Sequence, residues 1–138
     1  MIAKSAAQRT YLKRMVVVSV IYLASTFTAA AVIDDGDPVT WLTVILAIMP
    51  GLGVVGYIWA ITRLMIEEQD EFLRMLIVRQ SLIATAISLS AASVWGFLEQ
   101  FGVAPHVDAY WWAIIYFFGF GIGGLVNRIQ YGASGQCL

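Results

Sequence analysis

The chain has 138 residues, of which 60% are hydrophobic and 12% are charged, whereas soluble domains average about 45–50% and about 25%. The net charge of −1 leaves no basic surface for nucleic acid, and the single Cys and single His exclude an internal disulfide framework and a His-rich metal site. With a mean hydropathy of +0.80, the composition predicts a small integral membrane protein rather than a water-soluble globule.

Four uncharged runs predict the helices that cross the bilayer. They cover residues 15–33, 41–62, 80–98 and 110–127. About 20 apolar residues in a helix span the roughly 30 Å hydrocarbon core, and the runs do not alternate as barrel strands would. The connections are short, so the expected fold is all-α. We expect an up-down four-helix bundle that forms one membrane domain over residues 1–138.

The charges around the first and later runs predict the orientation. The first run exceeds the 7–15 apolar residues of a signal peptide, so a retained helix is expected. All eight cationic residues fall on one side of the four runs: Lys4, Arg9, Lys13, Arg14, Arg63, Arg74, Arg79 and Arg128. Because cytoplasmic segments carry the excess of Lys and Arg, both termini and the middle connection are expected in the cytoplasm.

The second run contains helix breakers and a stripe of small residues. Ala47 and Gly51 are four residues apart, which gives one helix face a flat strip that allows another helix to approach closely. Pro50 beside Gly51 also allows a broken helix that opens backbone carbonyls to a cavity, as in transporters. A small-solute channel or carrier assembled from several chains is therefore the alternative function. A kink satisfied by neighbouring helices is the favoured interpretation.

An acidic segment joins the second and third runs. The chain is expected to reverse near residues 66–70, with a third helix continuing to about residue 98, because acidic side chains favour a helix N-terminus. The charged residues of this segment are Glu67, Glu68, Asp70, Glu71 and Arg74. We expect a capped, solvated helix start with local ion pairs, since Arg74 lies three and four residues after two carboxylates. A cytoplasmic docking surface is the alternative.

Within this segment, Asp70-Glu71-Phe72-Leu73-Arg74 is similar to the acidic Asp-Glu-x-x-Arg hairpin of small, uncharacterised four-span inner-membrane proteins of proteobacteria. The similar layout of hydropathy covers the whole chain. The resemblance implies a multi-pass protein of a bacterial inner membrane. It implies no activity.

The third and fourth runs carry further small-residue stripes. Ser81, Thr85 and Ser88 recur at helical spacing, and Ala92 and Gly96 continue their face. In the fourth run, Gly119 and Gly123 are predicted to make the closest helix–helix contact of an assembly. The alternative is that their groove admits the chain's own second helix around Gly53 and Gly56.

The outer connection contains the one set of possible metal ligands, Glu99, His106 and Asp108, whose spacing matches no metal motif. An ion at these three residues is thus an open alternative, and neither a cofactor nor a catalytic residue is predicted. The lone Cys137 excludes self-contained thiol redox chemistry. The expected function is non-catalytic, by homo-oligomerisation or as an accessory subunit of a membrane complex. The partners are the lipid bilayer and itself or another membrane protein.

Overall fold

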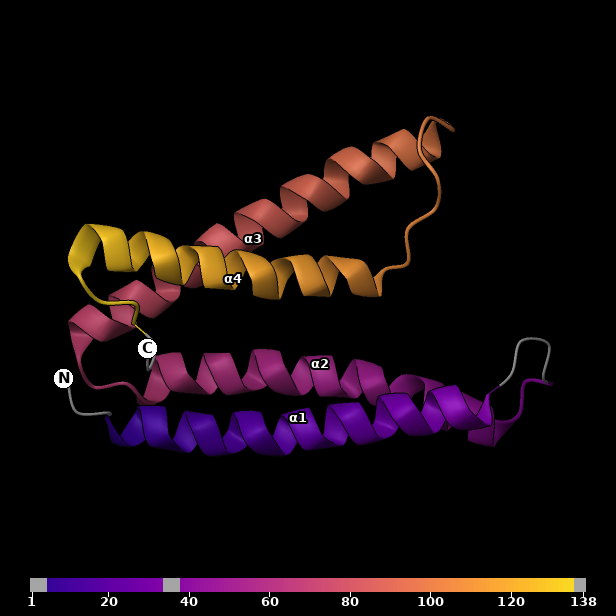
Figure 1. Cartoon of the computed structure of the whole chain (residues 1–138), viewed down its shortest axis with the longest axis horizontal. Coiled ribbons are helices and arrows are strands. Elements are labelled where there is room, and N and C mark those ends of the chain that lie inside the picture. Colours follow the sequence, from indigo (N-terminus) through magenta and orange to yellow (C-terminus); the bar gives the residue numbers. More distant parts are fainter. Residues whose placement is uncertain (1–4, 34–37, 136–138) are drawn as a thin grey trace. The chain divides into compact units, whose positions relative to one another are not determined.

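The computed structural model describes residues 5–33 and 38–135, and four α-helices account for most of them. They are α1 (Ala6–Val32), α2 (Trp41–Glu67), α3 (Glu71–Gln100) and α4 (Tyr110–Tyr131) (Figure 1). Each helix is long and apolar enough to cross a membrane. The prediction of an all-α chain with four helices of spanning length is confirmed.

Helices α1 and α3 begin before their uncharged runs because polar side chains cap them. The run that starts at residue 15 lies in a helix that begins at Ala6. Before it, Ser5 and Gln8 form a capping box, in which the Gln8 backbone N–H donates to Ser5 Oγ at 3.1 Å and the Ser5 N–H donates to Gln8 Oε1 at 3.2 Å. In these two helices the uncharged run therefore marks the apolar part and not the N-terminus, whereas α2 and α4 begin where their runs begin.

The reversal between the second and third helices lies where the charges placed it. Helix α2 ends at Glu67 and α3 begins at Glu71. Asp70 caps α3, because its Oδ1 accepts from the backbone N–H groups of Phe72 and Leu73 at 2.9 and 3.2 Å. This confirms the predicted turn, and α3 continues to Gln100 over 30 residues.

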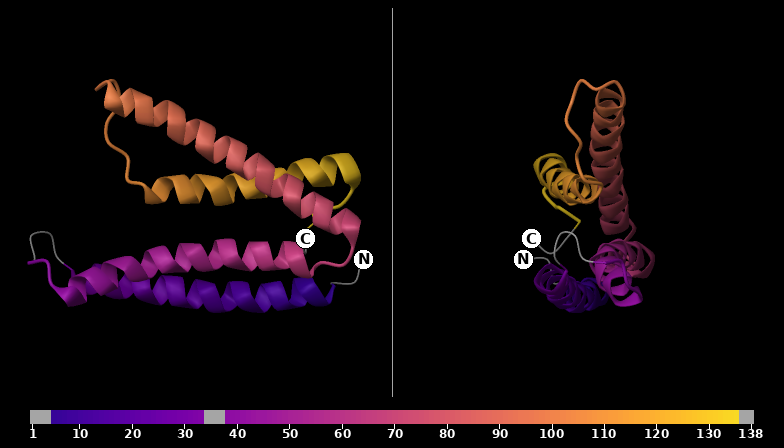
Figure 2. Two further views of the ribbon diagram at one scale, coloured as in Figure 1. Left: turned by 180° about the vertical axis from the view of Figure 1, so that it is seen from behind. Right: turned by 90° about the vertical axis from the view of Figure 1, so that its right-hand side faces the viewer.

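The chain divides into two compact units, Met1–Glu68 and Gln69–Leu138. Helices α1 and α2 lie side by side in the first unit, and α3 crosses α4 in the second (Figure 2). The four-helix bundle and the single membrane domain stay predictions, because each unit is a helix pair by itself.

Two glycines of α2 allow α1 to approach closely. A Cβ atom at Gly53 would lie 3.0 Å from Cβ of Tyr22, and one at Gly56 would lie 3.1 Å from Cγ1 of Val18. Real Cβ contacts are rarely this short, so larger side chains at these positions would push the helices apart. The second run thus uses Gly53 and Gly56 for contact within the first unit.

Helices α3 and α4 are close at one end and apart at the other. They cross where residues 80–84 of α3 meet residues 119–123 of α4, and they diverge toward the connection formed by residues 101–109 (Figures 1 and 2). At the close end, Gly135 has a φ of +72°, and a Cβ there would lie 2.9 Å from Cβ of Leu76. The chain after α4 therefore folds back tightly onto α3.

Candidate functional site

The small residues of α4 form the tightest part of the α3–α4 contact. A Cβ at Gly119 would lie 3.0 Å from the Ala84 Cα, and one at Gly123 would lie 2.9 Å from the Gln80 Cα. Both glycines are buried. The groove that they form is thus filled by α3 within the same chain. The predicted alternative occupant, the region of α2 around Gly53 and Gly56, instead contacts α1.

Two buried amides add hydrogen bonds to this contact. Gln80 Nε2 donates to the Phe120 carbonyl at 2.7 Å, and Asn127 Nδ2 donates to the Leu76 carbonyl at 2.8 Å. Neither amide is predicted from the sequence as a contact residue, because both lie at the ends of apolar runs. The available signal is periodicity: Asn127 follows Gly123 by four residues, so the two share one face of α4.

The hydroxyl stripe of α3 has mixed surroundings. Ser88 is buried, and its Oγ donates to the Trp112 carbonyl at 2.8 Å. Thr85 is half-buried, while Gly96 is exposed with no heavy atom near its Cβ position. Ser81 Oγ is buried and has no hydrogen-bond partner among the described residues. One member of the stripe therefore joins α3 to α4 through a hydrogen bond.

The stripe of α2 has different surroundings. Ala47 and Gly51 are exposed, and no heavy atom of the described chain lies within 4 Å of a Cβ built at Gly51. Gly51 precedes Gly53 by two residues, which is about 200° around a helix of 3.6 residues per turn. Gly53 faces α1, so Ala47 and Gly51 lie on the opposite side of α2.

At the end of the first unit, Glu67 is held by two arginines. Arg14 donates to both of its oxygens at 2.6 and 3.0 Å, Arg63 donates at 2.5 Å, and the Arg14 guanidinium lies 5.2 Å from the ring centre of Trp59. Glu67 follows the uncharged run of residues 41–62. Its hydrogen bond from Arg14 lowers the pKa of the Glu67 carboxyl below its usual range. This cluster fastens α1 to α2.

The other members of the acidic segment do not gather around one point. Glu68 is buried and accepts a 2.7 Å hydrogen bond from Ser5 Oγ, whereas Asp70 caps α3. The Glu71 side chain is 90% exposed and lies 3.8 Å from Arg74. Helix capping and a local ion pair are both present, as the favoured interpretation predicted, whereas Glu68 is buried and not solvated. The docking surface stays a prediction.

The outer connection brings its three candidate ligands near one another. His106 Nδ1 lies 3.5 Å from Glu99 Oε1, and His106 Nε2 lies 3.8 Å from Asp108 Oδ1. Glu99 also accepts from the Val107 backbone N–H. Over residues 5–33 and 38–135, no three His, Cys, Asp or Glu side chains are arranged to hold a metal ion. Glu99 therefore serves as the fastening point of this connection.

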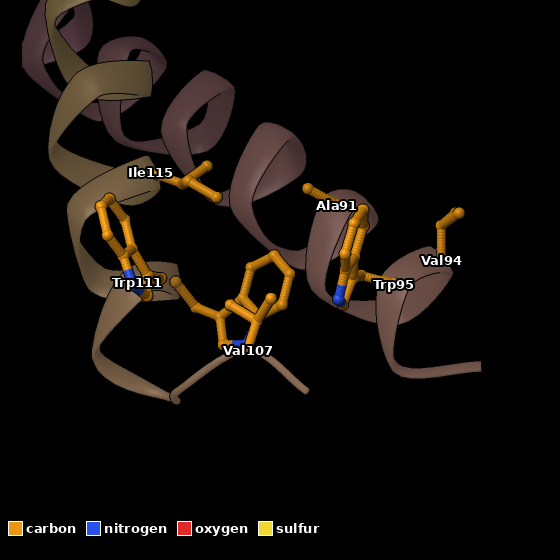
Figure 3. A pocket seen from close by; sticks show the side chains of 7 residues that line it. Ala91, Val94, Trp95, Val107, Trp111 and Ile115 are labelled. Atoms are coloured by element: carbon orange, nitrogen blue, oxygen red, sulfur yellow. The ribbon is translucent and has the colours of Figure 1, made fainter. Parts of the chain in front are cut away.

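A pocket of about 400 Å³ opens where α3 and α4 diverge (Figure 3). Its lining is almost entirely apolar and comes from both helices and from their connection. The lining residues are Ala91, Val94, Trp95, Val107, Trp111, Trp112 and Ile115. Trp95 Nε1 donates to the Pro105 carbonyl at 3.3 Å, which links one wall to the connection. Tryptophans near the end of a span are also typical of an aromatic belt at the membrane interface, so the sequence alone does not predict this pocket.

No family model matches the chain, and no curated protein or solved structure matches it. Among the residues named in the sequence analysis, Lys4 and Cys137 lie outside the described residues.

Proposed function

We propose that this protein is a four-span inner-membrane protein, with both termini in the cytoplasm, that acts without catalysis by associating with other membrane helices. The partner is a second copy of the chain or a larger complex in which the protein is an accessory subunit. The placement of all eight cations on one side supports the orientation. The resemblance in the acidic hairpin supports the inner membrane.

The observation that carries the proposal is the exposed small-residue face of α2. Lipid provides no hydrophobic drive between helices, so close backbone packing takes over that role. The glycines that meet a helix in their own unit are buried or half-buried, whereas Ala47 and Gly51 are exposed. Pro50 lies beside them and has no N–H, so the carbonyl one turn earlier, at Leu46, has lost its usual helical donor. A partner helix that packs here covers both features.

The test compares two glycines that are alike in the chain by itself. No described heavy atom lies within 4 Å of a Cβ at either Gly51 or Gly96. Both Gly51→Leu and Gly96→Leu should therefore fold. We expect only Gly51→Leu to lower the molecular mass of the complex, as measured by light scattering or native mass spectrometry in mild detergent. Equal assembly of the two variants, or a monomeric parent with no partner in a pull-down from native membranes, would contradict the proposal.

The alternative, a small-solute channel or carrier assembled from several chains, has one supporting observation. The Ser81 hydroxyl and the Gln80 Oε1 acceptor are buried and have no hydrogen-bond partner in the described part of the chain. A water-filled path beside α3 would satisfy them. Solute flux into liposomes that contain the purified protein tests this function directly, and Gly51→Leu should remove flux if assembly forms the path.

A further inference from the structure

We propose that the pocket between α3 and α4 binds a lipophilic cation, with the apolar body among the tryptophans and the positive charge beside Glu99. This inference is independent of whether the chain associates, because both walls of the pocket belong to one unit. The pocket volume of about 400 Å³ lies within the range of sites for small organic molecules.

The shape of the pocket follows from how its two walls are held. At the far end of the pair, glycine contacts and buried amides fix α3 against α4, as described above. Ser88 Oγ bonds to the Trp112 carbonyl at the near end, directly before the helices diverge. The connection is held against α3 beside the pocket, because the Val107 N–H donates to Glu99 and the Pro105 carbonyl accepts from Trp95. The cavity is therefore preformed within a fastened hairpin.

The lining suits a cation with an apolar body. Three of its seven residues are tryptophans, whose ring faces attract cations more strongly than those of other aromatic residues. In Figure 3 the labelled indoles of Trp95 and Trp111 come from opposite helices and flank the space between them. The apolar body of a ligand thus fits between the two walls, and its positive charge is attracted by the faces of the indole rings.

The carboxylate of Glu99 decides the sign of the charge. Ala91, Trp95 and Glu99 are spaced by four residues, so they share one face of α3. Glu99 also accepts from the N–H of Val107, which is itself a lining residue; Glu99 is not one of the seven lining residues, so its carboxylate lies beside the pocket and not within it. Its side chain is 25% exposed.

The other charged side chains of the connection also favour a positively charged ligand. Residues 99–109 contain Glu99, Asp108 and His106 but neither Lys nor Arg. His106, whose Nδ1 lies 3.5 Å from Glu99 Oε1, is the one basic side chain with which a bound cation would compete there. An anion of the same shape would meet two carboxylates and no fixed positive charge.

The experiment uses two probe ions of one shape and opposite charge. Tetraphenylphosphonium and tetraphenylborate each carry four phenyl groups around a central atom. Binding to the full-length protein in mild detergent is followed by equilibrium dialysis and by tryptophan fluorescence. We expect saturable binding of the cation and at least tenfold weaker binding of the anion. No saturable binding of the cation, or equal binding of the two ions, would overturn the proposal.

Two variants locate the charge and the walls. Glu99→Gln retains an oxygen for the Val107 N–H, and it should weaken cation binding at least tenfold while the anion is unaffected or improved. Glu71→Gln removes an equally negative, 90% exposed side chain at the other end of α3 and should change neither. Trp111→Ala should weaken both ions. If Glu99→Gln loses helicity, the ratio of the two ions on the unaltered protein still decides the question.

Competition between tetraphenylphosphonium and two phospholipids distinguishes the possible sources of the cation. The same ammonium chemistry belongs to free lipophilic amines and to the headgroup of an aminophospholipid. If phosphatidylethanolamine displaces tetraphenylphosphonium and phosphatidylglycerol does not, the natural ligand is a lipid. If neither lipid displaces it, the ligand is a free lipophilic cation. Displacement by phosphatidylglycerol alone would contradict a site selective for cations.

Discussion

The α3–α4 contact gives the sharpest prediction about stability, because α4 contains two glycines with opposite surroundings. A Cβ at Gly123 would lie 2.9 Å from the Gln80 Cα and 3.0 Å from the Gln80 carbonyl oxygen. Both atoms belong to the backbone of a helix and cannot turn aside. At Gly121, no described heavy atom lies within 4 Å of the same added carbon.

The magnitude follows from two opposing effects. Replacing glycine by alanine in a helix is favourable by about 1 kcal/mol at either position. At Gly123 the added methyl also overpacks a close contact, which typically costs about 1–3 kcal/mol. We therefore expect Gly121→Ala to be neutral or stabilised. Gly123→Ala should be less stable than Gly121→Ala by about 1–3 kcal/mol, and Gly123→Leu should be less stable still.

The measurement is unfolding in mixed micelles with increasing dodecyl sulfate, followed by tryptophan fluorescence and by circular dichroism. The oligomeric state is recorded in parallel. If Gly123→Ala is as stable as Gly121→Ala, the close α3–α4 contact is not present in the membrane protein. If Gly123→Leu dissociates an oligomer and leaves the monomer folded, the glycine groove serves another chain, and our assignment to α3 is wrong.

Two further predictions concern single contacts within each helix pair. Ser88→Ala removes the hydrogen bond to the Trp112 carbonyl and should cost about 0.6 kcal/mol, and at most about 1.7 kcal/mol, in the same unfolding assay, whereas Ser90→Ala, at an exposed position, should cost nothing. In the first unit, Gly53→Ala should be less stable than Gly51→Ala by about 1–3 kcal/mol, because only the Gly53 position contacts Tyr22. Equal stability within either pair of variants would refute the corresponding contact.

The sequence predicted the helices better than it predicted their contacts. Uncharged runs reveal a spanning helix because charges are costly in hydrocarbon, and this effect needs no knowledge of neighbouring helices. The turn before α3 was also predictable from local sequence, because acidic side chains favour a helix N-terminus, and Asp70 caps the helix that follows. Helix ends were less accessible. The first helix begins at Ala6, before its uncharged run, because the capping box at Ser5 satisfies backbone N–H groups at that helix end.

The identity of the contact faces depends on the tertiary structure. Gly51 and Gly53 are two residues apart in one apolar run, yet one is exposed and the other is buried against Tyr22. A GxxxG-like spacing predicts that a face is flat, but it does not predict which helix covers that face. The pocket was inaccessible for a related reason. It arises from the divergence of α3 and α4, and a row of tryptophans near the end of a span equally fits an aromatic belt.

The acidic end of α2 gives the last prediction, which concerns pH. The hydrogen bond from Arg14 lowers the pKa of the Glu67 carboxyl, so the folded state binds a proton less readily than the unfolded chain, whose pKa is about 4.3. The contribution of this group to stability is therefore fully present above about pH 5, and it is lost as the pH falls through the lowered pKa of the folded state. Glu67→Gln should be less stable than the unaltered protein at pH 7.

The difference in stability between Glu67→Gln and the unaltered protein should shrink as the pH is lowered to 3. Added salt should reduce this difference at pH 7, because the Arg14–Glu67 ion pair is partly exposed. Glu71→Gln provides the control: its carboxylate is 90% exposed and 3.8 Å from Arg74, so its curve should follow that of the unaltered protein. Thermal unfolding between pH 3 and pH 7 measures all three. A Glu67→Gln curve parallel to that of the unaltered protein would show that Arg14 and Arg63 do not hold Glu67 in the folded hairpin.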